Sequence, residues 1–208
     1  MTPFDLLFEP TEPGAGAARI YGVVVGIVTS NSQDPEDLGR IKVRFPWLSD
    51  QDESAWARVA TPMAGKERGC YFLPEVNDEV LVAFEHGDPR FPCVLGALWN
   101  GQDTPPAKND DGHNNVRLIK SRSGHVVRLV DEAGKEKIEI VDKTGKNSIV
   151  FDAQANTVTI TADKDIVLSA AQGTIKLDAQ KIELKSAADA KVEAGADLKL
   201  KGATVNIN

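Results

Sequence analysis

The sequence is poor in the residues from which most catalytic and metal sites are built. Its 208 residues include three histidines and two cysteines, and only 6% are aromatic. His86, His113 and His125 are too widely spaced to form a close set of metal ligands. Ser121 and Ser123 lie near His125, but this polar hairpin lacks the strand, turn and helix that expose a nucleophile. We therefore predict no catalytic residue, no enzymatic activity, no metal site and no cofactor, although an ion on a symmetry axis would leave no signature in one chain.

Long hydrophobic runs are also absent. No stretch of 18 apolar residues occurs, so no transmembrane helix is predicted. The N-terminus lacks both the basic start and the longer apolar core of a secretory signal. Cys70 and Cys93 lie in apolar, strand-like surroundings, which favours buried thiols over a disulfide.

Positive charge is scarce in the first half of the chain. Residues 1–115 contain 9 Lys and Arg against 18 Asp and Glu, whereas residues 116–208 contain 15 against 13. A surface that follows a nucleic-acid backbone needs an excess of positive charge. We therefore expect no nucleic-acid partner.

The sequence does contain a repeat, which runs from residue 116 to the C-terminus. Apolar residues two positions apart recur every seven to eleven residues, as in Ile166/Leu168, Ile175/Leu177 and Ile182/Leu184. Short polar or Gly-containing stretches separate these pairs. This pattern predicts short strands of period two joined by tight turns.

One copy of this repeat cannot stabilise itself. Ordering eight backbone residues costs roughly 8–16 kcal/mol, whereas burying two aliphatic side chains returns about 3–6 kcal/mol. Three intertwined chains would bury every apolar stripe and pair every strand edge. A single-chain solenoid and a flat antiparallel meander stay open as alternatives. The trimer core predicted from the spacing consists of Phe151, Val158, Ile160, Ile166, Leu168, Ile175, Leu177, Ile182, Leu184, Val192, Leu198, Leu200, Val205 and Ile207.

The segment before the repeat is predicted to be a small barrel. Alternating apolar positions and Gly, Asn, Asp and Pro turns indicate several short strands in about eighty residues, which fits a closed or nearly closed barrel such as the OB fold. The expected strands are residues 21–30, 40–45, 55–60, 79–85 and 92–98.

Several motifs in this segment resemble one family. They are Leu38-Gly39-Arg40-Ile41-Lys42-Val43-Arg44-Phe45-Pro46-Trp47, Phe72-Leu73-Pro74-Glu75-Val76-Asn77-Asp78-Glu79-Val80, Phe84-Glu85-His86-Gly87-Asp88-Pro89 and Val94-Leu95-Gly96-Ala97-Leu98-Trp99-Asn100-Gly101. In this order they resemble the OB domain of central spike proteins of contractile injection machines, which include VgrG-type spikes, phage baseplate assembly protein V and spikes of extracellular contractile particles. The resemblance covers residues 19–106, and the repeat is similar to the β-helical needle of the same family. Asn77 stands where the family would have Gly.

This resemblance predicts an all-β homotrimer with an N-terminal OB-fold barrel followed by an intertwined triple-stranded β-helix. The predicted parts are an N-terminal peptide and linker (1–18), the barrel (19–101), a connector (102–115), a β collar (116–150) and the needle (151–208).

The resemblance also implies a role and partners. The chain would be a structural, membrane-puncturing spike, assembled in the bacterial cytoplasm into a phage tail or contractile particle and delivered to the envelope of a target cell. A separate trimeric hub would bind Phe4, Leu6, Leu7 and Phe8, with the tail tube as an indirect partner. A PAAR-repeat tip protein would bind Val205, Asn206, Ile207 and Asn208. The alternatives are a trimeric receptor- or carbohydrate-binding fibre tip and an OB-fold nucleic-acid-binding protein.

Overall fold

The computed structural model describes residues 19–48 and 52–206. Within these residues the regular structure is β-strand, apart from one short 3-10 helix, η2 (Glu85–Gly87), and no α-helix occurs in them. The all-β class predicted from the sequence is therefore confirmed. The chain divides after Lys120 into two compact units, which are described separately. The five-part division of the chain stays a prediction.

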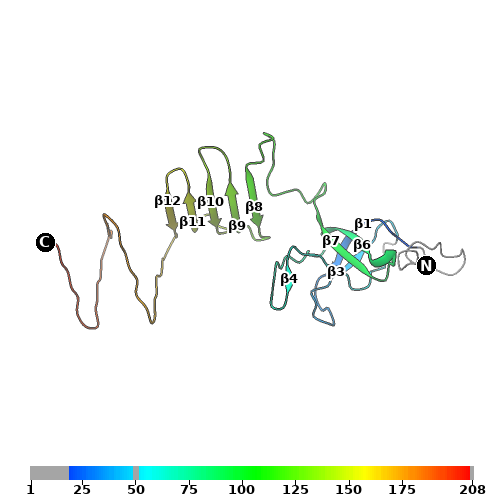
Figure 1. Cartoon of the computed structure of the whole chain (residues 1–208), viewed down its shortest axis with the longest axis horizontal. Coiled ribbons are helices and arrows are strands. Elements are labelled where there is room, and N and C mark those ends of the chain that lie inside the picture. The colour runs from blue at the N-terminus through cyan, green and yellow to red at the C-terminus, as the bar shows by residue number, and fades with distance from the viewer. Residues whose placement is uncertain (1–18, 49–51, 207–208) are drawn as a thin grey trace, which may run out of the picture. The chain divides into compact units, whose positions relative to one another are not determined.

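The first unit is built on one curled sheet (Figure 1). Its strand order is β2-β1-β6-β7-β3, in which β3 runs parallel to β7 and the other pairs are antiparallel. A separate pair, β4 and β5, forms a small hairpin. The strands of this unit are β1 (Val24–Ser30), β2 (Lys42–Arg44), β3 (Arg58–Val59), β4 (Ala64–Gly65), β5 (Arg68–Gly69), β6 (Glu79–Phe84) and β7 (Pro92–Leu98).

Backbone hydrogen bonds join the two ends of this sheet. The N–H of Ile41 donates to the carbonyl of Ala57 over 3.0 Å, and the N–H of Ala57 donates to the carbonyl of Ile41 over 2.7 Å. The sheet therefore curls into an OB-like barrel, as predicted. Alternate residues of its strands face inward and form a buried core of Val28, Ile41, Val43, Phe45, Ala57, Val80, Val82, Phe84 and Val94.

Asn77 occupies a turn that demands a left-handed backbone. Its φ is +80°, and its N–H donates to the carbonyl of Val28 over 2.9 Å. Asn tolerates this conformation better than most residues other than Gly. The substitution of Asn for the expected Gly therefore leaves the turn before β6 intact.

An antiparallel meander begins with β8, the last strand before the division at Lys120, and continues through the first strands of the second unit. The sheet order is β12-β11-β10-β9-β8, and successive strands lie side by side (Figure 1). Tight turns such as Asp142–Asn147 connect them. The strands are β8 (Val116–Lys120), β9 (Val126–Val130), β10 (Lys137–Val141), β11 (Ser148–Asp152) and β12 (Thr157–Thr161). The self-paired sheet extends to Thr161, and residue 150, the predicted end of the collar, lies within β11.

After β12 the regular pairing of strands ends. Residues 162–206 contain no assigned strand, and the chain runs as an open zigzag (Figure 1). Turns and bends recur at residues 163–164, 171–173, 180, 187–188, 195–196 and 203, which is a spacing of about eight residues. The extended stretches between them carry the apolar pairs of the repeat. The predicted periodicity is thus present as alternating extended stretches and bends.

Glu139 is a buried charge at the centre of one face of the meander. Its side chain is 9% exposed, and its carboxylate accepts hydrogen bonds from Arg128 on β9 and pairs with Lys137 of its own strand over 2.9 Å. Burial pushes the pKa of Glu139 upward, but the hydrogen bonds from Lys137 and Arg128 outweigh that effect and hold the pKa below its ordinary value. The three charges therefore tie β9 to β10.

This network makes the meander sensitive to acid. Because the folded-state pKa of Glu139 lies below its ordinary value of 4.5, its ionised form stabilises the fold above that pH, and the contribution is lost as the pH falls further. We predict that Glu139→Gln lowers the melting temperature at pH 7 by roughly 2–4 °C. The variant should also lose less stability than the parent protein between pH 6 and pH 3. Glu136→Gln, an exposed neighbour, is the matched control in thermal melts, and equal acid sensitivity of the parent and Glu139→Gln would contradict this role.

Candidate functional site

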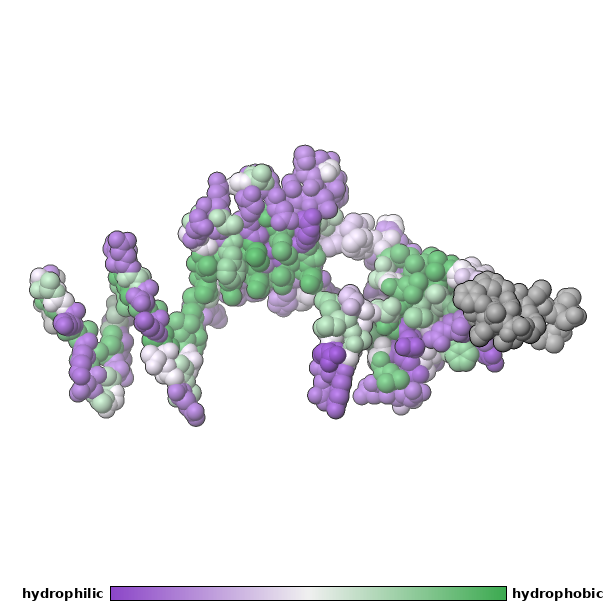
Figure 2. All heavy atoms as spheres, viewed as in Figure 1, coloured by the Kyte–Doolittle hydropathy of each residue, from purple (hydrophilic) through white to green (hydrophobic). Residues whose placement is uncertain are grey.

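Strand register places two rows of large apolar side chains on one face of the meander. The first row runs across β9 to β12 through Leu129, Ile138, Phe151 and Val158, and the second through Val127, Ile140, Ile149 and Ile160. Figure 2 shows this hydrophobic band over the strands, with hydrophilic residues gathered at the turns. We call these eight residues the apolar face.

No described part of the chain covers the apolar face. Val158 is 61% exposed and Ile160 is 57% exposed, although both are aliphatic residues in a sheet. Folded monomers rarely expose a continuous apolar patch larger than a few hundred square ångströms unless a partner binds it. The apolar face is therefore the candidate interaction surface of the meander.

The zigzag segment continues the same pattern. Its apolar residues are all exposed, up to 87% for Leu184, while the residues between them form short-range ion pairs such as Lys176 with Asp178 and Lys191 with Glu193. Each pair joins residues two positions apart, which lie on the same side of an extended chain. One side of the segment is thus apolar and the opposite side is charged.

Among the described residues, the backbone of this segment has few hydrogen-bond partners, and none of them forms a strand ladder. Between residues 162 and 206, the one backbone-to-backbone hydrogen bond is a weak turn contact of 3.3 Å from the N–H of Gly173 to the carbonyl of Ala170. Extended chain with free N–H and C=O groups is a template for pairing with another strand. The segment therefore offers both an apolar stripe and unsatisfied hydrogen-bonding groups to a partner.

The residues predicted to form a trimer core all lie on these two surfaces, as far as the structure describes them. Phe151, Val158 and Ile160 belong to the apolar face, and the members from Ile166 to Val205 lie on the zigzag. Ile207 lies outside the described residues. So do Asn208 of the predicted tip site and the predicted hub-docking residues Phe4, Leu6, Leu7 and Phe8, whereas Val205 and Asn206 are described and exposed. Assignment of these residues to a trimer core, a hub or a tip protein stays a prediction.

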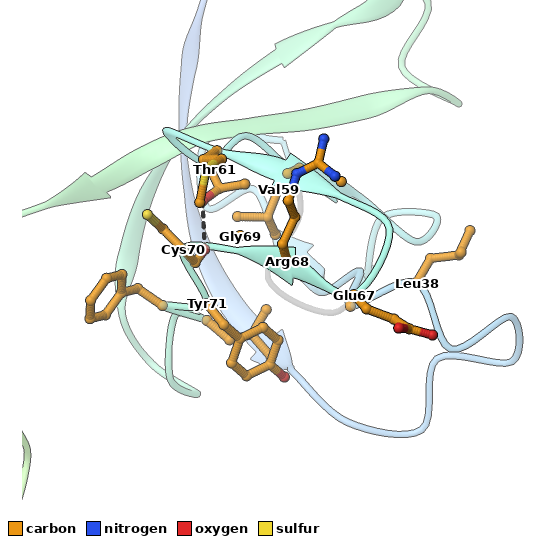
Figure 3. Close-up of a pocket in the computed structure, with 14 residues that line it drawn as sticks. Leu38, Val59, Thr61, Glu67, Arg68, Gly69, Cys70 and Tyr71 are labelled. Atoms are coloured by element: carbon orange, nitrogen blue, oxygen red, sulfur yellow. Dashed lines mark hydrogen bonds between the residues drawn. The ribbon is translucent and has the colours of Figure 1, made fainter.

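Sequence reasoning missed the β4–β5 hairpin of the barrel. It borders an open groove of about 570 Å³ that is lined mainly by apolar side chains. The hydroxyl of Thr61 donates to the carbonyl of Cys70 over 2.6 Å and holds the end of the hairpin against the strand that precedes it (Figure 3). The sequence feature that indicates this hairpin is the pair of glycines at 65 and 69, which lie on either side of a turn with a positive φ at Glu67.

The described residues offer no site for a metal ion and no membrane-spanning helix. The described ranges contain no group of three or more His, Cys, Asp and Glu residues able to hold a metal ion. They also contain no helix long and apolar enough to cross a membrane.

Comparison with known proteins identifies the barrel. Residues 24–99 match the family of type VI secretion system/phage-baseplate injector OB domains. The chain is 34% identical over 92 residues to the type VI secretion system spike protein VgrG3 of Vibrio cholerae, which covers 42% of this chain and 9% of that protein. It is 34% identical over 112 residues to the spike protein VgrG5 of Pseudomonas aeruginosa, with 50% and 14% covered.

A third relative is named as a toxin. The actin cross-linking toxin VgrG1 of Vibrio cholerae is 28% identical over 109 residues, which cover 48% of this chain and 10% of the toxin. The matched residues thus span between 9% and 14% of these three relatives. Residues 24–99 are a type VI secretion system/phage-baseplate injector OB domain, and the chain is a distant relative of the VgrG spike proteins.

Proposed function

We propose that this protein is the structural central spike of a contractile injection machine, with its OB barrels at the base and its C-terminal repeat as the needle. The observation that carries the proposal is the combination of an injector OB domain with a C-terminal zigzag whose extended stretches form no strand ladder, and whose apolar stripe stays exposed, among the described residues. The apolar face and the apolar stripe of the zigzag both expose large aliphatic side chains to water, so both would be stabilised by burial against a partner.

A homotrimer meets this requirement. Around a three-fold axis, the apolar face and the zigzag stripe of each copy point toward the other two and leave water together. The free N–H and C=O groups of each extended stretch then meet a stretch of a neighbouring copy. The charged sides, with pairs such as Lys176 with Asp178, remain outside.

Such a shaft suits a mechanical role. Adjacent strands are spaced by about 4.8 Å, so eight successive wound segments extend about 40 Å, compared with about 30 Å for the hydrocarbon core of a bilayer. Strand pairing between copies and a dry axis resist bending. The spike would transiently contact and puncture a target membrane when the sheath contracts, with no reaction catalysed by its own residues.

The spike needs partners at both ends. At the base, a trimeric hub would bind the apolar residues Phe4, Leu6, Leu7 and Phe8 and connect the spike to the tail tube. At the other end, a PAAR-repeat protein would cover the strand ends formed by 205–208. Assembly would take place in the bacterial cytoplasm, before the particle reaches the envelope of a target cell.

The trimer core can be tested with one pair of variants. Ile175→Asp would place three carboxylates together on the axis, where an unpaired charge is strongly disfavoured. We expect the trimer to dissociate at least about 100-fold more readily in sedimentation velocity experiments. Thr174→Asp, one position away on the opposite side of the same extended stretch, should remain trimeric. A stable Ile175→Asp trimer would refute the core assignment.

The tip site predicts a separable defect. Deletion of residues 202–208 should abolish capture of a PAAR-repeat protein and leave the trimer intact, because the remaining wound stretches still pair. Pull-down with a tagged PAAR-repeat protein and the sedimentation coefficient measure the two properties independently. Capture at the parental level would reject 205–208 as the binding site.

The proposed role as a central spike is tested by locating the protein in contractile particles. In cells that carry the gene, immunogold labelling of isolated contractile particles should place this protein at the baseplate end of the tube. Removal of the gene should leave particles without a spike. Particles that retain a complete spike and normal puncturing of target cells would overturn the proposed function, whatever the oligomeric state.

A further inference from the structure

Four large apolar side chains line the groove beside the β4–β5 hairpin and remain exposed there. They are Leu38, Met63, Tyr71 and Phe72, and Tyr71 is 79% exposed. Leu38 comes from the loop before β2 and Tyr71 follows β5, so segments far apart in the sequence line one groove (Figure 3). Large apolar side chains that lie together on a surface indicate a binding site, whereas single exposed ones do not.

Polar contacts hold the wall of the groove that carries Leu38. The carboxylate of Asp34 accepts hydrogen bonds from the N–H groups of Leu38 over 2.8 Å and Arg40 over 3.1 Å, and it pairs with the Nη2 of Arg40 over 2.6 Å. The hydrogen bond from the Arg40 side chain holds the pKa of Asp34 below its ordinary value, so this carboxylate is ionised at neutral pH. The Nδ2 of Asn31 donates to the carbonyl of Pro74 over 2.9 Å and ties the loop to the segment after β5. This wall is therefore in place before any ligand binds.

The hairpin forms the opposite wall and brings positive charge to it. The hydrogen bond from Thr61 described above holds the end of the hairpin. The side chain of Arg68 folds over Gly65, and Lys66 lies at the tip of the hairpin, with Glu67 as the one acidic residue between these two cations. The groove thus has an apolar lining and a basic rim. A ligand that suits it is apolar and acidic.

The first residues of the chain, which lie outside the described residues, have this composition. Residues 1–18 contain three acidic residues and no Lys or Arg. Phe4, Leu6 and Phe8 occupy every second position, with Asp5 between the first two. In an extended peptide, residues at every second position lie on the same side, so these three side chains could enter an apolar groove together while Asp5 faces the basic rim. We call residues 4–8 the N-terminal segment.

The linker is long enough for the N-terminal segment to reach the groove of its own barrel. The described chain starts against η2, where the N–H of Ile20 donates to the carbonyl of Gly87 over 2.8 Å. An ion pair of 3.2 Å between Glu85 and Arg58 connects η2 to β3, and β3 leads directly to Thr61 at the groove. This route consists of two short runs of backbone and one ion pair. The ten linker residues span up to ~33–36 Å when extended, which covers it.

We propose that the N-terminal segment binds in the groove of its own barrel, with its three alternate apolar side chains against those that line the groove. Both sets of side chains then leave water together. The inference needs no second copy of the chain and does not rest on the proposed spike. The hub proposed above would bind the same segment, so the hub and the groove would compete for it. The groove would keep the segment out of water until the hub arrives.

Photocross-linking of the full-length protein tests where the segment lies. We would place p-benzoylphenylalanine at position 6, because its benzophenone inserts into nearby C–H bonds under near-ultraviolet light. We expect cross-links within one chain to the tryptic peptides 59–66 and 69–90, which contain Met63 and Tyr71. Cross-links to other parts of the chain, cross-links that join two chains on a denaturing gel, or no cross-link at all would overturn the proposal. Each of these results leaves the proposed spike intact, because the readout does not depend on a hub or on the needle.

A matched pair of substitutions tests the groove itself. Leu38→Asp and Leu48→Asp change leucines that are both 66% exposed, and of the two only Leu38 lines the groove. The carboxylate at position 38 removes apolar contact and repels the acidic segment, so the cross-linking yield should fall at least about fivefold. Leu48→Asp should leave the yield unchanged, and thermal melts check that both variants are folded. Equal yields from the two variants would reject the groove as the binding site.

Discussion

The need to pair the backbone of residues 162–206 determines how the second unit is built. An extended chain exposes one N–H and one C=O group at almost every residue, and burial of these groups without partners is costly. In the described part of the chain, strand ladders supply these partners up to β12, and after β12 only isolated hydrogen bonds do, such as those of the Asp163 and Gly173 N–H groups. Its apolar stripe must nevertheless leave water to be stable. A strand from outside the chain satisfies both conditions at once, which neither a loose coil nor a single-chain sheet does.

The two units therefore have different sources of stability. In the barrel, Val28, Val43, Val80, Val82 and Val94 are fully buried within one chain. Among the described residues of the meander and zigzag, no apolar side chain is fully buried, and exposure ranges up to 87% for Leu184. The barrel has a core made of its own contacts, whereas in the proposed trimer the repeat would gain its core from neighbouring copies. This division suits a part in which the base attaches to a machine and the shaft must be continuous.

Much of this organisation could be predicted from the sequence, because it depends on local alternation. Periodicity and turn residues can be recognised in a single sequence. They account for the paired apolar residues, the spacing of about eight residues and the OB motifs around 38–47 and 72–101. The extent of the meander was not predictable in this way, since the spacing around Phe151 and Ile160 resembles that of the wound segment. What distinguishes them is the bond from Asp163 to Asn147, a contact across sixteen residues that depends on the turn geometry fixed by Asp142. The β4–β5 hairpin was missed because two-residue strands leave too little alternation to detect.

The central claim is that the backbone of the zigzag is hydrogen-bonded to other copies of the same chain. Amide hydrogen–deuterium exchange of the purified full-length protein, followed by mass spectrometry of peptides from 165–206, measures this most directly. We predict slow exchange throughout the segment, comparable with that of β6 in the barrel, because each amide is held by a neighbouring copy. Complete exchange of the segment within seconds, while the barrel remains protected, would contradict the account.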